Sequence, residues 1–159
     1  MPQTPKYYWD SGLFIAWLKD ETRKPGEMEG LAEVVSMIDK KEAILITSVI
    51  TRTEVLESSL TSENKGKFDL LFKRTNCIQV DVNAPISEMA HDIREFYKTK
   101  TGKNLKTPDS THLATAIIYQ CDELQTFDED DMIPLSGNVA DHNLVICKPK
   151  GKQMVIMFP

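Results

Sequence analysis

The stretch that decides the fold is residues 7–18, YYWDSGLFIAWL, where a short β-prone run ends at an aspartate and a helical pattern follows. Lys6 to Trp9 predicts a strand. Ser11 can cap a helix whose apolar residues recur at helical spacing, namely Leu13, Phe14, Trp17 and Leu18. Asp10 is therefore expected to lie where a strand ends and a helix begins.

The same alternation of strand and helix continues over the first 128 residues. Residues 43–46 form a continuous apolar run typical of a buried parallel strand, and residues 77–82 and 123–127 predict two more strands. Three further helices are expected over residues 31–40, about 50–60 and 63–74, after a loop at 20–30. Two more helices begin at Pro85 and at Thr107, and Thr107 is the expected N-cap of the last one. This order predicts an α/β fold, a three-layer sandwich with a mostly parallel central sheet, in a single domain over residues 1–159.

Composition and charge exclude several classes of protein. The chain has 159 residues, 41% hydrophobic and 27% charged, which is ordinary for one globular domain. Its three cysteines have no paired spacing, so we expect neither disulfides nor a zinc site. No membrane span or signal peptide is recognisable, so we expect a cytoplasmic location. The net charge of -5 argues against a surface that is basic throughout.

Four acidic side chains follow predicted strands or begin predicted helices: Asp10, Glu54, Asp109 and Asp128. In a parallel sheet such positions lie at the carboxyl ends of the strands, where ligands bind. Two like charges about 4 Å apart cost on the order of 4 kcal/mol at an effective dielectric near 20. A cluster of carboxylates therefore predicts a bound hard cation, Mg²⁺ or Mn²⁺.

Each of these acids also has an ordinary explanation when it is taken alone. An aspartate at a strand end is most often a turn or cap residue. Asp109 could simply complement the dipole of its helix, and Glu54 could be a solvated helix residue. The prediction of a metal site rests on the joint arrangement of the four.

Four segments resemble the acidic motifs of the PIN-domain family, in the order and at the approximate spacing of that family. They are YYWDSGLFIAWL (7–18), ITSVITRTEVLE (46–57), KTPDSTHLATAI (106–117) and LQTFDEDD (124–131). The resemblance implies that Asp10, Glu54, Asp109 and Asp128 bind the metal and are catalytic. It further implies outer roles for Ser11 and for Asp130 or Asp131, and it leaves the fold of residues 132–159 open.

The resemblance implies a Mg²⁺- or Mn²⁺-dependent endoribonuclease that cleaves structured RNA, often tRNA or rRNA. Many one-domain members of this family are VapC-like toxins of toxin–antitoxin pairs. They are usually homodimers, and a small antitoxin protein whose segment lies along the acidic site holds them inactive. We therefore expect a homodimer with an RNA substrate and a possible antitoxin partner.

Two other interpretations remain open. The chain could be a PIN-like module that has lost catalysis and binds RNA or another protein. It could also be a metal-dependent phosphohydrolase of another α/β family, although the DxDx[TV] start of aspartyl-phosphate hydrolases is absent at Asp10. Metal binding together with RNA turnover would separate the nuclease from the silent module.

Basic residues near the third motif are candidates for RNA contact. Lys103 and Lys106 precede Asp109, and Arg52 precedes Glu54 by two residues. Phosphate contacts here would offset the negative net charge locally, and the alternative is a solvated loop. The three histidines lack the spacing of metal ligands. His112 follows Asp109 by three residues, and we expect it to serve in helix packing.

Overall fold

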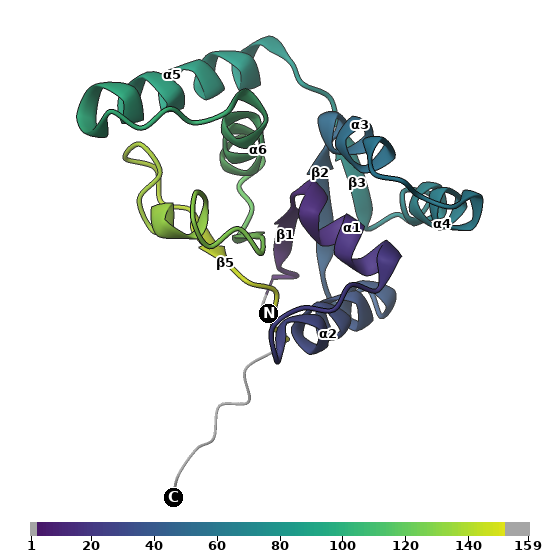
Figure 1. The fold of residues 1–159 in the computed structure, drawn as a ribbon. Coiled ribbons are helices and arrows are strands. Elements are labelled where there is room, and N and C mark those ends of the chain that lie inside the picture. The colour runs from purple at the N-terminus through teal and green to yellow at the C-terminus, as the bar shows by residue number, and fades with distance from the viewer. Residues whose placement is uncertain (1–2, 152–159) are drawn as a thin grey trace, which may run out of the picture.

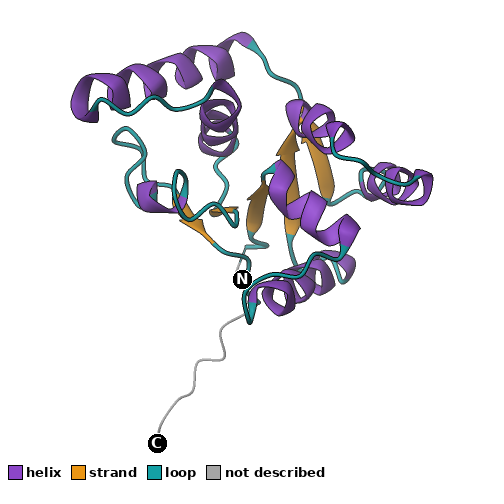
Figure 2. Ribbon diagram, viewed as in Figure 1, coloured by secondary structure: helices purple, strands orange, loops and turns teal. Residues whose placement is uncertain are grey.

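The computed structural model describes residues 3–151, in which a five-stranded sheet lies between two layers of helices (Figures 1 and 2). The strands are β1 (Lys6–Trp9), β2 (Ile44–Ser48), β3 (Cys77–Val80), β4 (Glu123–Gln125) and β5 (Val145–Cys147). The helices are α1 (Ser11–Lys19), α2 (Glu27–Asp39), α3 (Val49–Glu57), α4 (Ser62–Leu71), α5 (Ala84–Thr101), α6 (Thr107–Ile118) and the 3₁₀ turn η1 (Ile133–Leu135). The predicted three-layer α/β sandwich is confirmed.

The sheet has the order β3-β2-β1-β4-β5, and each neighbouring pair is parallel. The first strand of the chain therefore lies at the centre, with the second and fourth strands beside it. Because the strands are parallel, their carboxyl ends meet at one edge of the sheet. The segments that follow β1, β2 and β4 are brought together at this edge.

Two apolar cores cover the two faces of the sheet, and β1 contributes to both because successive side chains of a strand alternate. Tyr8 packs in the core that α5 and α6 close. Trp9 packs in the core that α1 to α4 close, where Phe14 and Phe68 are also fully buried. The apolar pattern of the first strand and helix predicts that Trp9 and Trp17 are core residues rather than platforms for base stacking. Trp9 is buried, but Trp17 is only partly buried, and its ring centre lies 4.3 Å from the Lys67 ammonium nitrogen.

Several predicted boundaries are wrong, each for a local reason. Helix α2 begins at Glu27 rather than at residue 31, because Gly26 enters it with a positive φ of 87° and Glu27 accepts hydrogen bonds from Arg23 and from the Lys24 amide. The N-cap of α6 is Lys106 and not Thr107. The Thr107 carbonyl accepts the Ser110 and Thr111 hydroxyls inside the first turn. Helix α3 ends at Glu57, before Leu60, and β4 ends at Gln125 rather than at residue 127.

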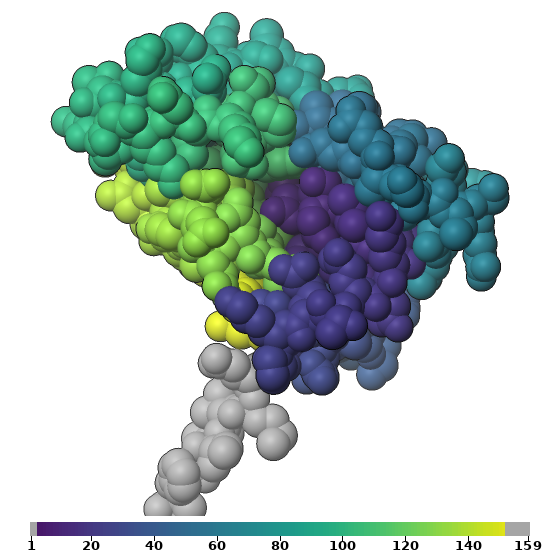
Figure 3. Space-filling model, in the orientation of Figure 1, coloured from purple at the N-terminus to yellow at the C-terminus, as the bar shows by residue number. Residues whose placement is uncertain are grey.

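The segment after residue 131, whose fold the sequence left open, adds η1 and the edge strand β5 beside β4. The chain then passes close to α2, and Figure 3 shows its yellow atoms beside purple atoms of the N-terminal part of the chain. A Cβ atom on Gly30 would lie 2.2 Å from the Pro149 carbonyl oxygen, and the Gly151 amide donates to Glu33 at 2.8 Å. Lys148 binds both Glu27 and Glu129. The sequence of this segment has two apolar runs, at 144–147 and 154–158. The first contains β5, and the second lies outside the described residues.

The three cysteines are free thiols, as the sequence predicts. Within residues 3–151, no helix combines the length and the apolar character that crossing a bilayer requires.

Candidate active site

Three of the four predicted acids line one open pocket at the carboxyl edge of the sheet. Asp10, Asp109 and Asp128 reach it from β1, α6 and the segment after β4, and the pocket has a volume of about 440 Å³. Ser11 and Thr126 line the same pocket. The sequence places these acids at strand ends and helix starts, and the fold brings the three together.

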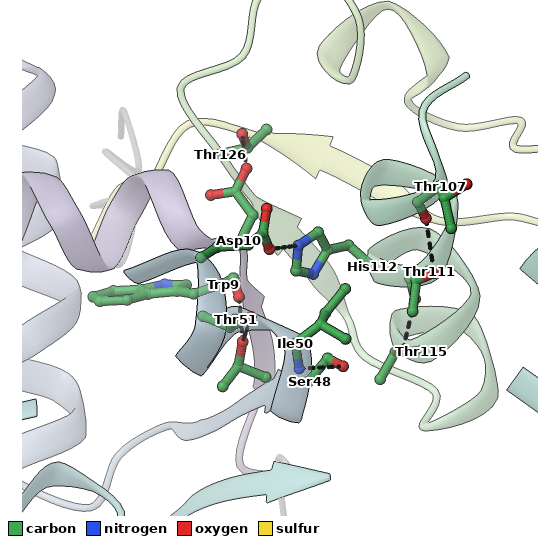
Figure 4. Close-up of polar contacts among 12 residues, drawn as sticks. Trp9, Asp10, Ser48, Ile50, Thr51, Thr107, Thr111, His112, Thr115 and Thr126 are labelled. Carbon is green, nitrogen blue, oxygen red and sulfur yellow. Dashed lines mark hydrogen bonds and ion pairs between the residues drawn. The ribbon is translucent and has the colours of Figure 1, made fainter. Parts of the chain in front are cut away.

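Asp10 is held in place by both of its carboxylate oxygens. Oδ1 accepts the Leu13 amide at 3.3 Å, so the N-cap of α1 is Asp10 and not Ser11 as predicted. Oδ2 accepts the Thr126 hydroxyl at 2.5 Å (Figure 4). Burial raises the pKa of Asp10, and the nearby charge of Asp109 raises that pKa further. The Thr126 hydrogen bond acts in the opposite direction. The Asp10 carboxylate is therefore rigidly oriented but poorly solvated.

Asp109 lies in the first turn of α6 and is partly buried. Burial raises the pKa of its carboxyl group, and the charges of Asp128 and Asp131 raise it further. Lys106, at the N-cap of α6, acts in the opposite direction. The environments of Asp10 and Asp109 thus disfavour the ionised carboxylates. A bound cation would offset this cost, because it neutralises the repulsion between the negative charges.

Asp128 is fixed by the turn that follows it. Its Oδ1 accepts the amides of Asp130 at 3.1 Å and Asp131 at 2.9 Å. Of the two predicted outer acids, Asp130 is exposed, whereas Asp131 acts on Asp109 through its charge. Asp131 is therefore the better candidate for an outer role.

Glu54, the fourth predicted acid, does not line this pocket and is instead bound to His112. Its Oε1 lies 2.7 Å from His112 Nε2, and His112 Nδ1 lies 2.6 Å from the Tyr8 hydroxyl. The His112 side chain is only 2% exposed, whereas that of Glu54 is 30% exposed. His112 stands one helical turn after Asp109 in α6, so it connects Glu54 to the element that carries Asp109. The predicted packing role of His112 is incomplete, because sequence spacing alone could not show the contact with Glu54.

Buried hydroxyl groups hold the start of α3 against β1. The Thr47 hydroxyl donates to the Trp9 carbonyl at 2.7 Å and is 2.7 Å from the Thr51 hydroxyl, and Ser48 caps the helix through the Ile50 amide (Figure 4). These bonds satisfy polar groups at a junction that carries Glu54 one turn later. They explain why the second motif is rich in serine and threonine.

The three predicted RNA contacts have different surroundings. Lys106 is exposed, and its charge acts on Asp109. Lys103 binds the carbonyl and carboxylate oxygens of Asp131, at 3.2 and 3.5 Å. Arg52 forms an ion pair with Asp69 of α4. Lys103 and Lys106 therefore border the acids, whereas Arg52 points to a neighbouring helix.

The donor set suits a hard divalent cation. Within residues 3–151, no three His, Cys, Asp or Glu side chains form a ready-made ligand cluster. Mg²⁺ does not require one, since it keeps several waters and is commonly held by one or two carboxylates together with substrate phosphates. The pocket offers oxygen ligands alone, and burial and like charge raise the pKa of two of its acids. The residues present therefore fit a hard divalent cation, and Asp10, Asp109 and Asp128 are the pocket side chains that would hold it.

Comparison with protein families gives one match over most of the chain. The family model described as PIN domain matches residues 7–133, which include all four acidic motifs. A search of the curated proteins finds no match.

Solved structures with this fold include toxin–antitoxin proteins. VapBC2 from Rickettsia felis, bound to a promoter DNA fragment, matches with a TM-score of 0.65 at 15% identity, over 89% of this chain and 98% of that one. A toxin–antitoxin complex from Klebsiella pneumoniae matches with a TM-score of 0.60 at 20% identity, over 87% and 99%. The sarcin–ricin loop cleaving toxin VapC20 from Mycobacterium tuberculosis matches with 0.58 at 16% identity, over 78% and 91%. At these identities the likeness establishes the fold.

Proposed function

Because the chain belongs to the PIN domain family, we propose that it is a metal-dependent endoribonuclease that hydrolyses RNA phosphodiester bonds. The observation that carries the proposal is the meeting of Asp10, Asp109 and Asp128 in one pocket, with the pKa of Asp10 and of Asp109 raised by burial and like charge. Carboxylates in this state are suited to a divalent cation and a phosphate group.

Asp10, Asp109 and Asp128, which line the pocket, would hold Mg²⁺ or Mn²⁺. Glu54 lies outside the pocket with Oε1 bound to His112, and it is the fourth ligand that we propose. A cation bound there supplies Lewis-acid stabilisation of phosphate oxygens and lowers the pKa of water. Hydrogen bonds within the chain orient the carboxylates of the site. The Thr126 hydroxyl donates to Asp10, and the amides of the turn at 130–131 donate to Asp128. Ser11 lines the pocket and can hydrogen-bond a water there. Lys103 and Lys106 attract the phosphate backbone toward the acids.

We further propose that the protein is the toxin of a toxin–antitoxin pair and acts as a homodimer on tRNA or rRNA in the cytoplasm. Two of the solved structures with this fold are toxin–antitoxin complexes, and a third is a toxin that cleaves the sarcin–ricin loop. An antitoxin would be a small protein that covers the acidic pocket. Co-expression with any short reading frame that lies directly upstream of the gene, followed by size-exclusion chromatography with light scattering, tests both the partner and the dimer.

The direct test of the enzyme is cleavage of total tRNA and rRNA by the purified protein with Mg²⁺, with Mn²⁺ and with EDTA. We expect cleavage with metal and none with EDTA. Asp109→Asn should abolish cleavage, whereas the matched control Asp92→Asn, an exposed position of α5, should retain it. RNA binding without turnover under all these conditions would favour the catalytically silent module instead.

A further inference from the structure

One basic side chain, that of Arg23, lies among the acidic side chains of the pocket, and it belongs to none of the four acidic motifs. Of the described residues that line the pocket, Arg23 is the only basic one, whereas Asp10, Asp109, Asp128 and Glu21 are acidic. Arg23 belongs to the loop between α1 and α2. It also lines a second open pocket, of about 470 Å³, together with Lys24, Phe127 and Glu129. Arg23 therefore stands at the boundary between the acidic site and the surface next to it.

The guanidinium group of Arg23 is held from three directions. Its central carbon lies 4.2 Å from the centre of the Phe127 ring, the residue between Thr126 and Asp128. Nε donates to Glu27 at 3.2 Å, and Nη1 donates to Glu21 at 3.4 Å. A side chain that is already fixed loses little conformational entropy when a ligand binds. Arg23 is thus preorganised beside the acids.

The contacts of Arg23 differ in how readily they can be exchanged. Glu27 is nearly buried, with 6% of its side chain exposed, and it is also bound by Lys148 and by the Lys24 amide. Glu21 is 35% exposed, and its contact with Arg23 is long for a charged pair. An exposed ion pair of this kind contributes little to stability. An arginine has five N–H donors, so a phosphate can replace Glu21 while Glu27 and Phe127 keep the guanidinium in place.

We propose that Arg23 binds the RNA strand through a phosphate adjacent to the scissile one, and this inference rests on the proposed nuclease function. A scissile phosphate at Asp10, Asp109 and Asp128 would place the next phosphate of the strand beside it, in a pocket whose other charged lining residues are acidic. Arg23 is the lining residue that would offset the charge of that phosphate. A guanidinium, which can make two parallel bonds to a phosphate, is suited to that position.

The test compares Arg23→Gln and Arg23→Lys with two matched controls. Arg23→Gln removes the charge but keeps a donor for Glu27. Arg74→Gln removes the same charge from an exposed ion pair with Asp39, before β3 and hence at the opposite edge of the sheet. Lys24→Gln removes a neighbouring charge from a side chain that is 67% exposed. Affinity for fluorescently labelled tRNA is measured in EDTA over a series of salt concentrations, and KM and kcat are measured with metal.

We expect Arg23→Gln to weaken tRNA binding about tenfold and to raise KM more than it lowers kcat. The salt dependence of log Kd should fall by about 0.7–0.9, the value for one phosphate contact. Arg23→Lys should keep the salt dependence and lose part of the affinity. Arg74→Gln should match the wild type, and Lys24→Gln should have a smaller effect than Arg23→Gln.

Two results would overturn the inference, and they are distinguishable. If the wild type cleaves RNA and Arg23→Gln has the same affinity, KM and salt dependence, Arg23 only anchors the loop and the nuclease function stands. If the wild type neither binds nor cleaves tRNA or rRNA with any divalent metal, the proposed function fails and the inference fails with it. Thermal melts of both Arg23 variants identify any loss of affinity that is due to unfolding.

Discussion

His112 Nε2 lies 2.7 Å from Glu54 Oε1, and the hydrogen bonds on the other side of the ring determine which nitrogen carries the proton. The Tyr8 hydroxyl accepts the Ser48 amide at 3.2 Å, so its own proton is free to be donated to His112 Nδ1. Burial raises the pKa of Tyr8, which keeps that proton on the hydroxyl. With the Tyr8 hydroxyl donating to Nδ1, Nε2 is the His112 nitrogen that donates to the Glu54 carboxylate. Through this bond His112 is a positioning residue for Glu54.

Removing this positioning bond should weaken the metal site while leaving the fold intact. Mutation of a residue that hydrogen-bonds to a metal ligand typically lowers metal affinity or activity 10–100-fold. We expect His112→Ala to lose this much Mn²⁺ affinity and cleavage rate, and His112→Gln, which keeps a donor, to recover part of both. Calorimetric Mn²⁺ titration measures the affinity directly. The exposed His142→Ala is the matched control, and unchanged Mn²⁺ affinity in His112→Ala would reduce His112 to a packing role.

Divalent metal should stabilise the folded protein. A ligand that binds only the folded state adds RT ln(1 + [L]/Kd), which is about 2.7 kcal/mol at a hundredfold excess over Kd. For a chain of this size we expect Mn²⁺ to raise Tm by about 5–10 °C. Differential scanning calorimetry with Mn²⁺ and with EDTA measures the change. Asp109→Asn should lose most of this increase, whereas Asp92→Asn should keep it.

The raised pKa values of Asp10 and Asp109 predict how stability depends on pH in EDTA. A carboxyl group whose pKa is higher in the folded state binds protons more tightly when folded. Its stabilising contribution is therefore complete below the ordinary value of 3.8 and is lost as the pH rises through the folded pKa. At neutral pH Asp109→Asn should be at least as stable as the wild type.

This advantage of Asp109→Asn should disappear as the pH falls below 3.8, where the wild-type carboxyl is protonated in both the folded and the unfolded state. Urea midpoints of the two proteins at several pH values measure the difference. Glu129, whose pKa is lowered to about 2 by Lys148 and Lys24, has the opposite dependence in both proteins, so it cancels in the comparison. A mutant that is less stable than the wild type at neutral pH would indicate that Asp109 mainly stabilises the N-terminus of its helix.

Pro149 lies so close to Gly30 of α2 that a side chain at position 30 should destabilise the protein. The Cβ atom of Gly30→Ala would lie 2.2 Å from the Pro149 carbonyl oxygen, so backbone must move. We expect a loss of about 1–3 kcal/mol in the free energy of unfolding. Gly66→Ala, in α4 with nothing within 4 Å, should instead gain about 0.5–1 kcal/mol. Denaturant unfolding of both variants tests the contact, and equal effects would show that Pro149 does not pack on α2.

The sequence predicts most of the fold, because local patterns determine it. The apolar runs of β1 and β2 and the spacing around Leu13 and Phe14 are visible without tertiary information. The start of α2 is not, since Glu27 is buried by Lys148 and Arg23, and a charged residue in a Pro/Gly-rich stretch otherwise suggests a loop. The apolar sequence of β5 likewise does not show that this strand pairs with β4.

The site divides in the same way. The pocket that Asp10, Asp109 and Asp128 share follows from the positions of Asp10 and Asp128 after parallel strands and of Asp109 at the start of a helix, which the order of elements indicates. The role of Arg23 depends on its stacking against Phe127, which lies more than a hundred positions away. No periodicity or motif relates two such residues, and only the folded chain brings them together.

The order of the strands has a consequence for protein synthesis. Strand β1 lies at the centre of the sheet, yet the ribosome adds its neighbour β4 only after more than a hundred further residues. Until Glu123 to Gln125 have emerged, one side of β1 presents unpaired N–H and C=O groups, and Asp10 has neither Thr126 nor Asp128 beside it. An unfinished chain therefore carries no assembled pocket, so a ribosome that stalls before this point releases a fragment without the proposed nuclease site.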